Sequence, residues 1–68
     1  MKMKPFETVR SVADVPEHGV KAGDIGAIVD VYEDAYEVEF CNDDGETLAL
    51  FAMSEAQVTD AHPLRHAA

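Results

Sequence analysis

The 68-residue sequence contains no tryptophan and a single cysteine, Cys41, and its uninterrupted apolar runs are short. One cysteine excludes an intrachain disulfide, and a small domain without one is typical of a reducing cytosol rather than of secretion. No run approaches the roughly 18 apolar residues that a membrane-spanning helix needs. We therefore expect a cytoplasmic protein that does not contact a membrane.

Basic residues are also scarce. Five Lys and Arg stand against fourteen Asp and Glu, which gives a formal charge of −9, and Lys21 is the only basic residue between Val12 and Pro63. Because phosphate contacts require Lys and Arg, the sequence argues against direct nucleic-acid binding. Such a charge attracts basic proteins, although it also serves simply to keep a small domain in solution.

Residue patterns typical of catalysis, cofactors or metals are missing as well. No G-x-S-x-G motif surrounds any hydroxyl, and a chain of this length has little volume to enclose a small-molecule substrate. His62 and His66 have i, i+4 spacing, but Pro63 and the alanine-rich end predict a flexible tail over residues 61–68. The stretch NDDGE lacks the spacing of a calcium loop. We expect no enzyme activity, no cofactor and no metal.

Short alternating stretches between turn residues predict an all-β domain over residues 5–60. Pro16 and Gly19 mark a first loop, and Asn42-Asp43-Asp44-Gly45 is a strong hairpin signal. The expected strands are 6–12, 25–32, 35–41, 46–53 and 58–60, with a 3-10 or helical turn at 54–57. Five short strands with such connections are typical of a small SH3-like barrel.

Side-chain alternation predicts which residues face the core. In the third strand Tyr36, Val38 and Phe40 are expected inward. In the fourth strand the same reasoning places Leu48, Leu50 and Ala52 inward. The residues expected outward form a predicted protein-interaction surface: Ile28, Asp30, Tyr32, Glu37, Glu39, Phe51 and Met53.

Two alternatives to that surface stay open. The helical turn at 54–57 or the N-terminal segment could cover Phe51 and Met53, and the carboxylates could form only a solvated outer face. If the surface is exposed, an apolar patch surrounded by acidic residues suits a protein partner or a second copy of the chain.

The sequence resembles a family of short bacterial proteins catalogued as domain of unknown function 4926. The matching residues are Pro16-Glu17, GDIGAIV at 23–29, YEVEF at 36–40 and Asp44-Gly45-Glu46, and the resemblance covers about residues 8–58. It implies an SH3-like barrel with no assigned activity. Relatives beside toxin-like genes imply a neutralising, antitoxin-like partner role.

A looser similarity rests on the segment KAGDIGAIVDV at 21–31. This segment is similar to the KOW element of ribosomal and transcription-factor barrels and to the barrel of nitrile hydratase β-subunits. The second likeness implies an alternative function, an accessory or subunit-like barrel that supports an enzyme. The favoured expectation is a non-catalytic, acidic protein-interaction module.

Overall fold

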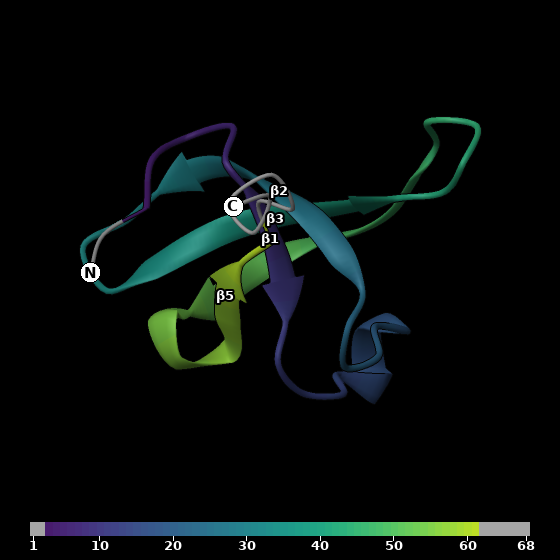
Figure 1. The fold of residues 1–68 in the computed structure, drawn as a ribbon, viewed down its shortest axis with the longest axis horizontal. Helices are drawn as coiled ribbons and strands as arrows, with labels where there is room; N and C mark the ends of the chain where they lie inside the picture. Colours follow the sequence, from purple (N-terminus) through teal and green to yellow (C-terminus); the bar gives the residue numbers. More distant parts are fainter. Residues whose placement is uncertain (1–2, 62–68) are drawn as a thin grey trace, which may run out of the picture.

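A computed structural model describes residues 3–61 as one antiparallel sheet (Figure 1). The strand order is β4-β3-β2-β1-β5. The elements in chain order are β1 (Thr8–Ser11), η1 (Pro16–His18), β2 (Ile25–Val31), β3 (Ala35–Cys41), β4 (Thr47–Ser54), η2 (Glu55–Gln57) and β5 (Val58–Asp60). The predicted all-β class and the 3-10 turn before the last strand are confirmed.

Two parts of the sequence-based prediction remain predictions. The ladders within residues 3–61 place β4 and β5 at opposite ends of the strand order, so they do not show a closed SH3-like barrel. Most of the predicted tail, residues 62–68, lies outside the described residues. None of the helical segments in the described chain is long and apolar enough to cross a membrane.

The turn between β3 and β4 is built around Asn42. Its side-chain oxygen Oδ1 accepts hydrogen bonds from the backbone N–H groups of Asp44 and Glu46, each at 2.9 Å. Gly45 has φ +84°, a conformation that glycine adopts without steric cost. This hairpin, predicted from the sequence, is confirmed, and it projects well beyond the rest of the sheet (Figure 1).

A β-bulge in β2 corrects the prediction for Ile28. Ile28 lies opposite Val38, whereas Asp30 lies opposite Glu37, so Val29 is an extra residue between the two pairs. A bulge shifts the alternation of side chains by one residue. As a result Ile28 is fully buried, and the prediction that it faces outward on the same side as Asp30 is wrong.

The side chains of β4 are also reversed relative to the prediction. Residues directly opposite each other in an antiparallel pair point to the same face. Met53 lies opposite Tyr36 and Phe51 opposite Val38, both of which are buried. Phe51 and Met53 therefore face the core, and the prediction that they point outward is wrong.

The other face of β4 points towards solvent. Leu50 lies opposite Glu39 and Ala52 opposite Glu37, and Leu48 and Leu50 are exposed. These positions had been predicted to face inward, and that prediction is wrong. The inward positions predicted for β3, namely Tyr36, Val38 and Phe40, are confirmed.

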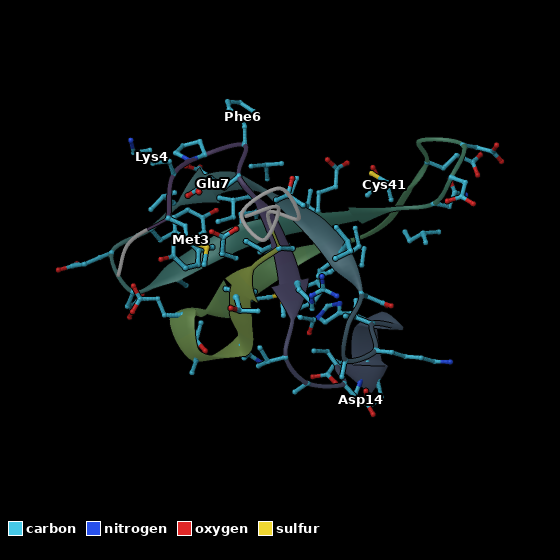
Figure 2. The ribbon with its side chains drawn as sticks, viewed as in Figure 1. Met3, Lys4, Phe6, Glu7, Asp14 and Cys41 are labelled. Atoms are coloured by element: carbon cyan, nitrogen blue, oxygen red, sulfur yellow. The ribbon has the colours of Figure 1, made fainter. Side chains whose placement is uncertain are left out.

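The core lies on the inner side of the sheet and receives contributions from the first loop and the N-terminal segment. Its buried hydrophobic cluster comprises Val9, Val15, Val20, Ile28, Tyr36, Val38, Phe40, Met53 and Val58. The backbone N–H of Met3 donates to the hydroxyl of Tyr36 at 3.0 Å, and Met3 packs against the cluster. Figure 2 shows Met3 against the ribbon, whereas Phe6 points away from it.

One side of Phe51 is covered by the first loop. The His18 ring stacks on the Phe51 ring with centroids 3.8 Å apart and an interplanar angle of 5°. Phe51 in turn lies 5.8 Å from the Phe40 ring, measured between centroids. The first loop is thereby joined to the core by a row of three rings, and Phe51 is half-buried rather than exposed.

Candidate protein-interaction face

Four of the predicted site residues lie together on the outer side of the β2–β3 hairpin. We call Asp30, Tyr32, Glu37 and Glu39 the acidic face. Asp30 and Glu37 are directly opposite each other across the two strands. Glu37 and Glu39 are two residues apart on β3, which places them on the same side, about 7 Å apart. Tyr32 follows β2 and is exposed.

Hydrogen bonds hold the carboxylates of this face in place. The Tyr32 hydroxyl donates to Glu37 Oε1 at 3.0 Å, and the Thr47 hydroxyl donates to Glu39 Oε2. Asp30 Oδ1 accepts from the backbone N–H of Val31 at 2.8 Å. Each of the three carboxylates therefore accepts a hydrogen bond from a neighbouring donor.

The contact between Tyr32 and Glu37 raises the pKa of the Tyr32 phenol above its ordinary value. The largest cause is the hydrogen bond to Glu37, followed by desolvation and by the negative charges of Glu37 and Asp30. Each of these favours the neutral phenol, because a phenolate beside two carboxylates would be repelled. The resulting stabilisation is present below the pKa of Tyr32 in the unfolded chain and is lost as the pH rises through the folded value.

We expect the Glu37→Gln variant to lower the pKa of Tyr32 towards its ordinary value. The substitution keeps a hydrogen-bond acceptor but removes the charge that opposes phenolate formation. Tyrosinate absorbance as a function of pH measures the change, and a Tyr32→Phe variant assigns the signal by removing it. An unchanged Tyr32 titration in Glu37→Gln would show that the contact between the two side chains does not persist in solution.

Exposed apolar side chains lie beside the acidic face on the same side of the sheet. Leu48 is 66% exposed and Leu50 is 52% exposed. Leu50 is directly opposite Glu39, so an apolar side chain and a carboxylate are immediate neighbours. Further along this side lies a shallow depression of about 250 Å³ lined by Thr8, Ile25, Gly26, Ala27, Glu39 and Cys41.

Sequence reasoning found the acidic half of this surface and missed its apolar half. Leu48 and Leu50 were assigned to the core because their strand is apolar at both odd and even positions. The signal that could have found them was the pairing with β3. Once Tyr36 and Val38 point inward, their partners Met53 and Phe51 must point inward too. Leu50 and Ala52, which lie opposite Glu39 and Glu37, must then point outward.

The side chains that could support other chemistry are dispersed. Within residues 3–61, no three His, Cys, Asp or Glu side chains gather closely enough to hold a metal ion. Cys41 is exposed at the end of β3, where Figure 2 shows it on the outside of the ribbon. His18 is stacked on Phe51. His62 and His66 lie outside the described residues.

Comparison with known proteins identifies the family. The model of the family described as "Domain of unknown function (DUF4926)" matches residues 6–60, which is most of the chain. The chain belongs to this family, as its GDIGAIV and YEVEF segments had suggested. No curated protein and no solved structure matches it.

Proposed function

We propose that this protein is a non-catalytic protein-interaction module that binds a basic partner protein through the acidic face. The observation that carries the proposal is the row of hydrogen-bonded carboxylates formed by Asp30, Glu37 and Glu39 beside exposed leucines. The basic residues of the described chain are Lys4, Arg10 and Lys21, and none lies in β2, β3 or β4.

Charge and apolar area serve different purposes in such a surface. Clustered negative charge steers a basic protein towards the face and raises the association rate. Leu48 and Leu50 add apolar area, whose burial lowers the free energy of the complex by about 25 cal/mol per Å² before the costs of association are counted. A carboxylate row beside exposed leucines thus combines the polar and apolar parts of a protein interface.

We take the partner to be a small basic protein of the toxin type, which the module would neutralise by covering its positive surface. The formal charge of −9 supports a basic partner, because negative charge attracts basic proteins. The same charge repels nucleic acid and anionic lipid. A neutralising role requires binding and no catalytic side chains. Cys41 and His18, two side chains that could take part in catalysis, lie in separate places.

The test compares two triple variants that remove the same charge. Asp30→Asn/Glu37→Gln/Glu39→Gln neutralises the acidic face, whereas Glu17→Gln/Asp43→Asn/Asp44→Asn neutralises the first loop and the hairpin tip. Proteins captured from a native lysate by the wild-type chain are identified by mass spectrometry, and association rates are then measured by surface plasmon resonance at two ionic strengths. We expect the first variant to associate about tenfold more slowly, with a weaker salt dependence, because steering is lost.

The control variant should associate at nearly the wild-type rate, since its charges lie away from the acidic face. Equal rates for the wild type and the acidic-face variant would contradict the proposal and would leave the carboxylates as an aid to solubility. Capture of an enzyme subunit instead of a small basic protein would favour the accessory-barrel alternative.

A further inference from the structure

Strand β4 forms one end of the sheet, and its outer edge has no strand partner within residues 3–61. Within residues 3–61 it pairs only with β3, and no other backbone–backbone hydrogen bond of the described chain involves residues 47–53. A free edge presents a row of backbone donors and acceptors that can pair with another strand. β5, at the other end of the order, has three residues, whereas β4 has eight.

Apart from a bulge at Leu48, the sequence of β4 carries few of the features that normally protect such an edge. Thr47–Ser54 reads TLALFAMS and contains no charged residue, proline or glycine. Natural sheets usually protect their edges with lysine, proline, bulges or very short strands. Each of the other four strands contains at least one charged residue, such as Arg10 in β1 and Asp60 in β5. In a chain with a charge of −9, β4 is the uncharged strand.

We infer that β4 pairs antiparallel with β4 of a second copy of this chain, so that the two sheets become one continuous sheet. Antiparallel pairing of identical strands is self-complementary across a two-fold axis, because the same edge is used on both sides. Since paired residues share a face, the exposed Leu50 and Ala52 of one copy meet Leu50 or Ala52 of the other. Their exposed side chains would then be covered.

The charge distribution does not oppose a second copy at this edge. In the joined sheet the carboxylates of β3 in the two copies are separated by three strand spacings, about 14 Å. The screening length at physiological ionic strength is about 8 Å, so repulsion between the two rows is largely screened. The acidic face therefore does not oppose the contact, and the uncharged β4 strands lie between the two rows.

The variant Leu50→Lys tests the inference in the full-length chain. In the single chain the new lysine lies directly opposite Glu39, a favourable cross-strand pair that keeps the fold intact. In the joined sheet the lysines of the two copies approach each other across the two-fold axis, which is unfavourable. Sedimentation equilibrium over a range of concentrations should show a reversible two-chain species for the wild type and at least about tenfold weaker association for Leu50→Lys.

Ile25→Lys is the matched control. Ile25 is an exposed apolar residue of β2 on the same side of the sheet, and its substitution changes the charge by the same amount away from the edge. Because the new lysine lies opposite Arg10, it lowers the stability somewhat, and thermal denaturation measures this cost separately. Ile25→Lys should associate like the wild type. Circular dichroism should show native spectra for both variants, and the β4 amides should exchange more slowly with solvent as the wild-type concentration rises.

Several outcomes would overturn the inference. A wild-type chain that sediments as one chain at every concentration would do so, as would equal association of the wild type and Leu50→Lys. Concentration-independent protection of the β4 amides in a single chain would assign the edge to residues 62–68 instead. The triple variant of the acidic face leaves β4 unchanged, so this inference and the proposed function can fail separately.

Discussion

Phe40→Ala should leave the protein unfolded or barely folded at room temperature. Phe40 is 4% exposed, sits in β3 and lies against Phe51. Removing a buried phenylalanine ring costs about 3–5 kcal/mol, from lost transfer free energy and from the cavity left behind. Below about 70–80 residues a single hydrophobic core rarely supplies more than about 3–5 kcal/mol of stability, so this loss is comparable to the whole stability of the domain. Circular dichroism during thermal and urea denaturation measures the loss.

Phe6→Ala is the control for this prediction, because it removes the same ring from an exposed position. Phe6 is 83% exposed and points away from the sheet (Figure 2). Its substitution should shift the melting temperature by only a few degrees, since surface changes are usually within about 0.5 kcal/mol. Similar melting temperatures for the two variants would contradict the burial of Phe40 and the pairing of β3 with its neighbours.

Gly26→Ala should have the second largest effect, although it adds a single methyl group. A Cβ atom at residue 26 would lie 2.8 Å from the backbone oxygen of Glu39 and 3.0 Å from two ring carbons of Phe40. The first contact is with the backbone of a paired strand, which cannot rotate away. Such overpacking costs about 1–3 kcal/mol or more, so the melting temperature should fall by about 5–20 °C.

The glycine of the β3–β4 turn provides the comparison. Gly45 has φ +84° and no atom within 4 Å of the position that a Cβ would occupy. Gly45→Asn should therefore cost little, because asparagine tolerates this backbone conformation better than other side chains do. If both variants melted at the wild-type temperature, β2 and β3 would not approach as closely at Gly26 as the structure indicates.

The strands were predictable because turn residues and alternation agree. The third strand was placed at the residues where the structure has it, since YEVEF alternates strictly and is followed by the Asn42 turn. The inward positions of Tyr36, Val38 and Phe40 followed from the same pattern. Where only one of the two alternating sets of side chains was apolar, the predicted side-chain directions were correct.

The errors arose where the sequence did not decide which alternating set of side chains faces the core. In β4 both alternating sets are apolar, so only pairing with β3 decides that Phe51 and Met53 face inward. In β2 the bulge at Val29 changes the phase within the strand, and no turn residue marks it. The acidic half of the candidate site was found because Asp30, Glu37 and Glu39 have little reason to be buried, whereas an exposed leucine has no such signature.

The Asn42 turn and the bulge at Leu48 together determine the register of β4. A one-residue slip of β4 along β3 would exchange the two apolar sets and put Leu50 in place of Phe51 against Val38. Hydrophobicity alone separates these two registers poorly, because both bury aliphatic or aromatic side chains. The paired hydrogen bonds to Asn42 Oδ1 and the left-handed Gly45 fix the length of the connection. The bulge at Leu48 then shifts the pairing by one residue, because the register of Cys41 with Thr47 would otherwise place Leu48 opposite Phe40 and Leu50 opposite Val38. The side of β4 that becomes the interior therefore depends on this one extra residue.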